Sequence, residues 1–181
     1  MSAMIPTREE KKEEKNTNVS RFLAKRGILL VKEFRDMFPV RGDYSGKIGI
    51  ATVILSTAKS AYADVQYGVK LEHLDEEGEI RGSGFLDYDE IDEVIGAFDF
   101  LDGVSQQMLN QQRDYTEVTY STKDNLKFGF YQLDGQQHGF IDVGGYGESL
   151  FLSVSNLRLL RESIHAAKQH LLSQGAETHN T

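Results

Sequence analysis

The chain of 181 residues contains no cysteine and only 2 prolines. Without cysteine it can form no disulfide, offer no thiolate nucleophile and build no cysteine-ligated zinc site. No stretch of the sequence approaches the roughly 20 consecutive apolar residues that a membrane-spanning helix needs. These absences exclude several classes of enzyme and metalloprotein, and they predict a protein without a membrane partner.

The two ends of the chain have few apolar residues. Residues 1–20 contain no apolar stretch of the kind found in signal peptides and carry four glutamates, which argues against a secretory or transit signal and favours a cytoplasmic protein. These residues, and residues 173–181, bury too little apolar surface to offset the entropy of ordering. We therefore expect disordered tails at 1–20 and 173–181 around a single globular domain at 21–172.

The net charge of −8 is unevenly distributed. Residues 21–47 contain seven basic and three acidic residues, whereas residues 48–112 contain three basic and thirteen acidic residues. An acidic protein binds phosphate backbones poorly in a non-specific way, but a local basic segment can still make a few phosphate contacts. Solvated acidic helix faces are the ordinary explanation of such an acidic segment.

Hydrophobic patterning predicts strands in the first half of the chain. Residues 48–57 are rich in β-branched residues and nearly apolar on both faces, which is typical of a central strand. Residues 65–71 alternate with period two, and a turn at 75–78 leads into a return strand at 80–85. Residues 21–40 fit either a strand at 28–34, which we favour, or a helix interrupted by a glycine.

The second half repeats this design. Residues 115–122 and 126–131 predict two strands joined by a turn, and Asp134-Gly135 opens the next turn before a strand at 139–143. A glycine-rich segment at 144–147 then precedes the largely apolar segment 150–154. Its glycines do not follow the spacing of a phosphate-binding loop, so we interpret it as a turn.

A faint duplication links the two halves. The segment Phe85–Phe98 aligns without a gap with Phe151–Ile164, and five apolar positions of the two segments coincide. Repeated supersecondary units usually stack and share one core. We therefore predict an α+β fold made of two pseudo-repeats, at about 48–111 and 114–172, in which antiparallel strands are followed by a helix and which pack as one domain.

Each repeat ends in an amphipathic helix. In the first, Asp87 and Glu90 have the spacing of a capping box, and Gly103 is a candidate helix end. In the second, Ser155 is a candidate N-cap and Gly175 a candidate stop. The predicted buried stripes are Ile91, Val94, Ile95, Phe98 and Leu101, then Leu157, Leu160, Ile164, Ala167 and Leu171.

No pattern of residues predicts catalysis, a cofactor or a metal site. His165 and His170 are five residues apart and so lie off one helix face, and His138 falls in a predicted hairpin where a solvated histidine is the simplest interpretation. The acidic run at 87–93 lacks the ligand order of a calcium loop. We therefore predict a non-enzymatic binding module.

Aromatic and basic residues on the outer faces of the predicted strands suggest one ligand. If Phe128 and Phe130 face the helices, Lys127 and Tyr131 face outwards, with Tyr115 beside them. Aromatic rings interleaved with cations stack the bases of single-stranded DNA or RNA and hold phosphates, and such binding weakens steeply with salt. The candidate nucleic-acid-binding residues are Arg41, Lys47, Lys70, Tyr115, Lys127 and Tyr131.

A second hypothesis is a protein-interaction or assembly subunit. The acidic first helix, through Asp89, Glu90 and Glu93, would dock a basic partner, or an open sheet edge would accept a strand. Formation of a homo-oligomer belongs to the same class of function.

The order of elements over residues 48–172 resembles the Whirly family and related transcriptional coactivators that bind single-stranded DNA. The resemblance consists of the helices that follow Phe85-Leu86 and Phe151-Leu152, and of Ser45-Gly46-Lys47 before an apolar strand. It implies a nucleic-acid-binding surface on the sheet and oligomerisation through helices.

Overall fold

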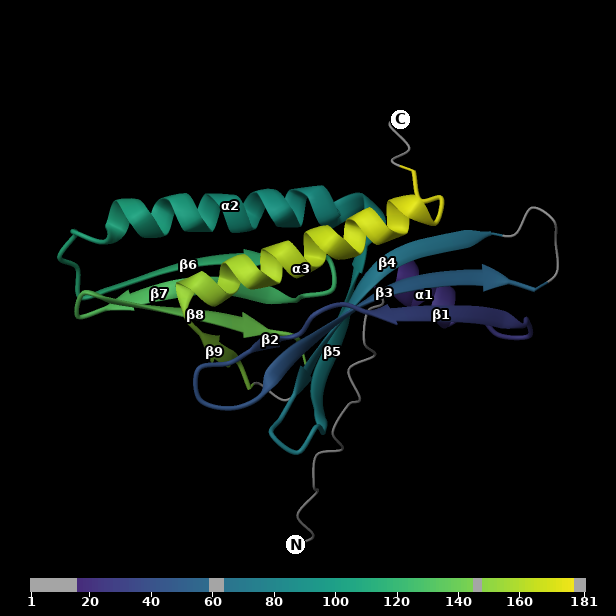
Figure 1. Cartoon of the computed structure of the whole chain (residues 1–181), viewed down its shortest axis with the longest axis horizontal. Coiled ribbons are helices and arrows are strands. Elements are labelled where there is room, and N and C mark those ends of the chain that lie inside the picture. Colours follow the sequence, from purple (N-terminus) through teal and green to yellow (C-terminus); the bar gives the residue numbers. More distant parts are fainter. Residues whose placement is uncertain (1–15, 59–63, 145–147, 178–181) are drawn as a thin grey trace, which may run out of the picture.

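The computed structural model describes residues 16–58, 64–144 and 148–177. In this part of the chain two antiparallel sheets lie beside each other, and two long helices run across one side of them (Figure 1). The predicted α+β class is confirmed. None of the described helices is long and apolar enough to cross a bilayer.

The first sheet, sheet A, has the strand order β1-β3-β4-β5, with the short β2 paired beside β1 on β3. The strands are β1 (Leu30–Asp36), β2 (Val40–Arg41), β3 (Lys47–Thr57), β4 (Val65–Leu74) and β5 (Ile80–Asp87). The strand predicted at 28–34 is therefore confirmed, with its start at residue 30. A helix at this position would have removed the antiparallel partner that β1 provides for β3.

The second sheet, sheet B, is a meander of order β6-β7-β8-β9. Its strands are β6 (Tyr115–Ser121), β7 (Lys127–Leu133), β8 (Gln136–Asp142) and β9 (Leu150–Leu152). Asp134 and Gly135 form the predicted two-residue turn, with φ angles of 49° and 78°. Positive φ at both positions matches the twist of a hairpin and fixes the register of β7 on β8.

The helices follow the sheets as predicted. A short 3₁₀ turn η1 (Tyr88–Glu90) leads into α2 (Ile91–Met108), and α3 (Val154–Ser173) follows β9. Both predicted apolar stripes are buried. The capping box at Asp87 is present, since the Glu90 carboxylate accepts a hydrogen bond from the Asp87 N–H at 3.0 Å.

Two predicted helix boundaries are wrong. Gly103 does not end α2, because it lies on the exposed side while Ser105 and Met108 continue the buried stripe. The N-cap of α3 is Ser153, whose Oγ accepts the Asn156 N–H at 3.1 Å, and not Ser155. Gly175 does stop α3, with φ at 98°, a value that only glycine adopts without strain.

The duplication is visible in the structure. Asp87 and Ser153, which the alignment places on each other, are the N-caps of the two helical segments. Leu86 and Leu152, one position earlier, are both buried at the ends of strands. Each half is thus an antiparallel sheet followed by a helix, and one apolar cluster with residues from both sheets and both helices unites the halves.

Helices α2 and α3 lie antiparallel and side by side (Figure 1). Ion pairs join Asp92 to Lys168, Asp99 to Arg161 and Asp102 to Arg158. The acidic members are seven and then three residues apart, and so are the basic members. The acidic face of the first helix is thus matched by the basic face of the second.

The predicted domain boundaries need correction. A short helix α1 (Asn18–Leu23) packs Val19 and Phe22 against Val53 and Leu55 on the outer face of sheet A, so the fold begins before residue 21. Two apolar side chains separated by polar ones are too weak a pattern to reveal this docking. At the other end Ala176 is buried, so the fold extends beyond residue 172.

The remaining residues predicted as tails, 1–15 and 178–181, lie outside the described residues. So does most of the glycine-rich turn predicted at 144–147.

The two sheets are joined through the loop after β2. The Asp43 N–H donates to the Phe151 carbonyl at 2.9 Å, and the Asp43 carboxylate accepts the Ser153 N–H at 3.0 Å. On the other side Gly82 of β5 lies against Gly144, where a Cβ would approach the Gly144 oxygen to 1.7 Å. Only glycine permits this approach of two backbones.

Candidate nucleic-acid interface

The six candidate residues fall into two groups. Arg41, Lys47 and Lys70 lie on sheet A, whereas Tyr115, Lys127 and Tyr131 lie on sheet B. Each group faces away from α2 and α3, because the alternate residues of the same strands are buried beneath those helices. The structure therefore does not bring the six together, and each face is considered separately.

The outer face of sheet B carries an aromatic stack, formed by Tyr115, Tyr131, His138 and Phe151. The Tyr131 ring lies 6.0 Å from Tyr115 and 5.0 Å from His138 between centroids, with interplanar angles of 25° and 24°. Phe151 meets Tyr131 edge-on at 6.4 Å. Four neighbouring strands, β6 to β9, thus each contribute one ring.

The stack is accessible at both ends. Tyr115 is 55% exposed and Phe151 is 43% exposed, while Tyr131 and His138 between them are half-buried. Two near-parallel rings with exposed neighbours provide a surface on which planar groups can stack.

Hydrogen bonds fix Tyr115 at the edge of the stack. Its hydroxyl donates to the Glu117 carboxylate at 2.5 Å, and the Thr119 hydroxyl donates to the same carboxylate at 2.8 Å. The bond from Tyr115 lowers the pKa of Glu117, and the same bond raises the pKa of Tyr115. Glu117 therefore remains charged at neutral pH, next to the rings.

Cations are scarce on this face. Among the residues of β6 to β9 that point outwards, Lys127 is the sole lysine or arginine, and it lies opposite Asp142 in the register of β7 and β8. With Glu117, the face carries one positive and two negative charges. It can hold bases by stacking, but it can neutralise few phosphates.

A pocket extends the aromatic stack towards sheet A. This pocket of about 400 Å³ lies between Phe151, Tyr44, His73 and Arg81. The Arg81 guanidinium donates to Asp75 at 2.7 Å. The backbone N–H of Glu79, the Arg81 guanidinium and the backbone N–H of Glu77 all lower the pKa of Asp75. Arg81 is thus held in place, partly neutralised, at the border of the two sheets.

Acidic residues lie near two of the three basic candidates of sheet A. Arg41 lies opposite Lys47 in the register of β2 and β3, and Lys47 lines a depression of about 310 Å³ together with Lys70. Lys70 forms an ion pair with Glu72, which lines the same depression, as does Asp36. This face has cations without stacked rings, whereas sheet B has stacked rings with few cations.

The acidic surface predicted for partner binding is smaller than expected. Glu90 is only 4% exposed, and its carboxylate accepts backbone N–H groups from Asp87 and Lys123 at 3.0 and 3.3 Å. Its assignment to a partner-binding surface is therefore wrong, because a capping carboxylate points inwards. Burial raises the pKa of Glu90.

The other two acidic candidates remain at the surface. Asp89 accepts a hydrogen bond from the Lys123 ammonium at 2.9 Å. Glu93 is exposed, and burial of Tyr120, together with its hydrogen bond to Glu93, raises the pKa of that tyrosine to about 12. Both carboxylates thus already have partners within the chain.

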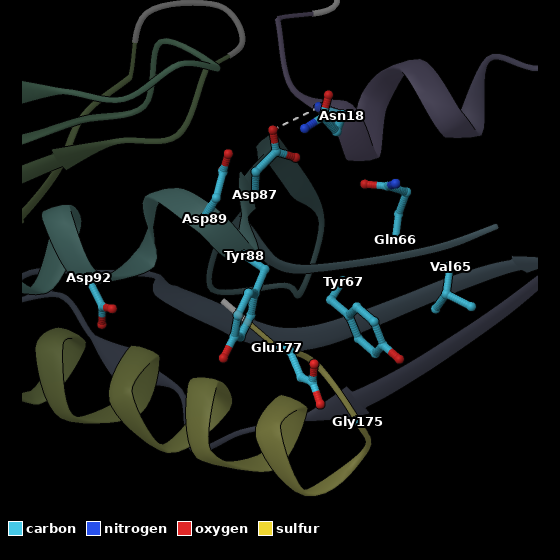
Figure 2. Close-up of a pocket in the computed structure, with 10 residues that line it drawn as sticks. All are labelled: Asn18, Val65, Gln66, Tyr67, Asp87, Tyr88, Asp89, Asp92, Gly175 and Glu177. Atoms are coloured by element: carbon cyan, nitrogen blue, oxygen red, sulfur yellow. Dashed lines mark hydrogen bonds between the residues drawn. The ribbon is translucent and has the colours of Figure 1, made fainter. Parts of the chain in front are cut away.

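A larger depression of about 490 Å³ adjoins η1 (Figure 2). Three of the four carboxylates that line it are engaged: Asp87 accepts the N–H groups of Asn18 and Val19 at 2.8 and 3.0 Å, Asp92 pairs with Lys168, and Asp89 pairs with Lys123. Within the described residues no three histidine, aspartate or glutamate side chains converge to hold a metal ion.

Two members of the aromatic stack were not among the candidates. His138 was interpreted as a solvated turn histidine, but it lies within β8, directly opposite Tyr131. The position of His138 could have been predicted from the two-residue turn at Asp134-Gly135. This turn pairs Leu133 with Gln136, and the same register pairs Tyr131 with His138. Phe151 could not be placed in this way, because a long connection separates β8 from β9.

Comparison of the sequence with protein-family models and with curated proteins found no match.

Proposed function

We propose that this protein binds single-stranded nucleic acid, without catalysing a reaction, through the outer face of sheet B. The observation that carries the proposal is the aromatic stack of Tyr115, Tyr131, His138 and Phe151 across four strands. Every base has a π-face, so such rings bind single strands with little sequence preference. A cytoplasmic location is part of the proposal.

Binding proceeds mainly by stacking. Successive bases lie on the exposed rings, beginning at Tyr115 and Phe151, and each stacked base contributes about 1–3 kcal/mol. Lys127 supplies one contact to a phosphate. The carboxylates of Glu117 and Asp142 repel further phosphates, so the bound strand follows the rings and not a basic groove.

The architecture supports a Whirly-like arrangement. In each half a path of four antiparallel strands, β1-β3-β4-β5 and β6-β7-β8-β9, is followed by a helix. The helices cover one side of both sheets and leave the opposite face of sheet B uncovered by any described helix. A sheet face that carries stacked rings is a common platform for single strands.

Fluorescence anisotropy with a labelled single-stranded oligonucleotide tests the proposal. We expect binding by the wild-type protein and a loss of about ten- to a hundredfold for Tyr131→Ala, the value of one stacked base. Phe100→Ala is the matched control, because Phe100 is an exposed ring on α2, away from the stack. Absence of binding at low salt, or equal losses for both variants, would refute the proposal.

A second candidate is an interaction protein. The acidic helix is a poor docking surface, because its carboxylates pair with α3 and Lys123. The open sheet edge predicted as an alternative is favoured by a specific observation: apolar residues at or near β1 are exposed. They are Ile28, Leu29, Val31, Phe34 and Phe38.

A further inference from the structure

Strand β1 forms one edge of sheet A. It pairs with β3 along its whole length, and no other strand of the described chain pairs with its second side. Six of its seven residues are exposed, and Phe34 at its centre is 50% exposed. A strand at the edge of a sheet presents a row of unpaired N–H and C=O groups, with which a strand of another chain can pair.

The direction of the backbone groups of β1 can be read from its ends. The Met37 N–H donates to Ile50 at 2.8 Å, and the Leu29 carbonyl accepts from Ala58 at 3.2 Å. Backbone groups alternate between the two sides of a strand, so odd-numbered residues point their N–H and C=O towards β3. The groups of Lys32, Phe34 and Asp36 therefore point away from β3, at the free edge.

The sequence of this edge is self-complementary. Around Phe34, residues 30–38 read Leu-Val-Lys-Glu-Phe-Arg-Asp-Met-Phe. When a second copy of this segment is laid beside the first in the opposite direction, with Phe34 opposite Phe34, every acidic residue lies opposite a basic one. Every other apolar residue lies opposite an apolar one. Within one chain this symmetry has no structural role, because the only described partner of β1 is β3, whose sequence is different.

We propose that two copies of the protein form a dimer by antiparallel pairing of β1 with the partner's β1, with the two-fold axis at Phe34. Phe34 then lies opposite the partner's Phe34. Glu33 lies opposite the partner's Arg35, and Lys32 lies opposite the partner's Asp36, each twice by symmetry. Val31 meets the partner's Met37, and Leu30 meets the partner's Phe38, so apolar contacts flank the charged ones.

The backbone supports this register. In it Phe34, Lys32 and Asp36, whose N–H and C=O groups point outwards, fall in hydrogen-bonded pairs. Three such pairs would exchange about six hydrogen bonds. A two-fold axis at Lys32 or Glu33 would instead place like charges opposite each other, which is destabilising.

Three of the four charged residues of β1 have no ion-pair partner in the described part of the chain. Lys32, Glu33 and Asp36 form no ion pair with any residue in the described part of the molecule, and Arg35 contacts the Nδ1 atom of His170 at 3.2 Å. The proposed dimer supplies the missing partners, independently of any nucleic-acid binding.

Cysteine cross-linking tests the register directly, since the natural chain has no cysteine. In Phe34→Cys the two cysteines would lie about 5.5 Å apart between Cα atoms, a distance that a disulfide spans. In Lys32→Cys, the matched control, the cysteines would be about 13 Å apart along the strands. We expect a covalent dimer on a non-reducing gel from the first variant and a monomer from the second.

A mixed experiment keeps the test independent of the Phe34 side chain. Lys32→Cys and Asp36→Cys proteins should each stay monomeric on the gel when oxidised alone, but should cross-link when mixed. Equal cross-linking of all variants, or none in any, would overturn the proposal.

Charge exchange provides a second test. Arg35→Glu places two pairs of carboxylates at the interface, and Glu33→Arg places two pairs of cations there. By light scattering, we expect the wild-type protein at twice its monomer mass of 20.4 kDa. Each variant alone should dimerise about tenfold or more weakly. Mixing the two variants should restore dimers, because every pair is then complementary.

Circular dichroism establishes that both charge variants are folded. A wild-type protein that stays monomeric at high concentration, or a dimer that neither variant weakens, would overturn the proposal. The edge of β1 would then be a binding site for a strand of another protein.

Discussion

The ring of Phe98 on α2 stacks on the ring of Phe128 on β7, with centroids 3.9 Å apart and planes 8° from parallel. Both residues are buried, and their contact fixes the first-repeat helix on the second-repeat sheet. The halves of the duplication are therefore not independent units. Each helix completes a core to which both sheets contribute.

Replacement of this ring should destabilise the whole domain. We expect Phe98→Ala to lower the free energy of unfolding by about 3–5 kcal/mol, because it removes a buried aromatic side chain and leaves a cavity. Urea denaturation followed by circular dichroism measures the change. Phe100→Ala, whose ring is 68% exposed on the same helix, should change it by less than about 0.5 kcal/mol. Similar losses in the two variants would contradict the assigned core.

Two glycines should respond oppositely to the same substitution. Gly82→Ala should be strongly destabilising, because the new Cβ would approach the Gly144 oxygen to 1.7 Å and separate the sheets. Gly96→Ala should stabilise by up to about 1 kcal/mol, because a Cβ there contacts nothing and alanine favours the helix. The midpoint temperatures of thermal unfolding of the two variants and of the wild type check this. A Gly82→Ala variant as stable as the wild type would show that the sheets do not meet there.

Much of this architecture could be predicted from the sequence. The helix stripes and the cap at Asp87 depend on local spacing, and the turn at Asp134-Gly135 sets its own register. Other features depend on contacts between distant segments. The docking of Val19 on Val53 and the pairing of Asp99 with Arg161 join residues far apart in sequence, so neither has a local signal.

The candidate site was predictable to a similar extent. The outward direction of Tyr131 follows from alternation with Phe130, and Tyr115 is its neighbour as expected. The separation of Lys70 from these rings could not be predicted, because it depends on the placement of one sheet relative to the other. The burial of Glu90 was in fact implied by its capping position, since a carboxylate that caps a helix start points towards the backbone.

Stability should decrease relative to a Gln variant as pH rises through the titration of Glu90. Burial raises the pKa of this carboxyl above its ordinary value of 4.5, so the folded state binds more protons than the unfolded state between the two values. Unfolding free energy then falls with increasing pH in that window. Urea denaturation measures the free energy of unfolding of wild type and of Glu90→Gln. From about pH 4 to about pH 7, the free energy of the wild type should fall relative to that of the variant. A constant difference would contradict the raised pKa.

Salt dependence distinguishes stacking from charge in the proposed nucleic-acid interface. The six candidate residues, if they formed one basic groove, would give the steep dependence expected from several phosphate contacts. On sheet B only Lys127 is available, so log affinity should fall with log salt at a slope of about 0.7, or about threefold over a fourfold rise in salt.

Two lysine variants localise the contact. Lys127→Ala should bring the slope close to zero, while Lys70→Ala should leave both slope and affinity unchanged, because Lys70 lies on sheet A and pairs with Glu72. Anisotropy titrations at several salt concentrations provide the slopes. A steep slope that Lys70→Ala reduces would move the interface from the rings of sheet B to the cations of sheet A.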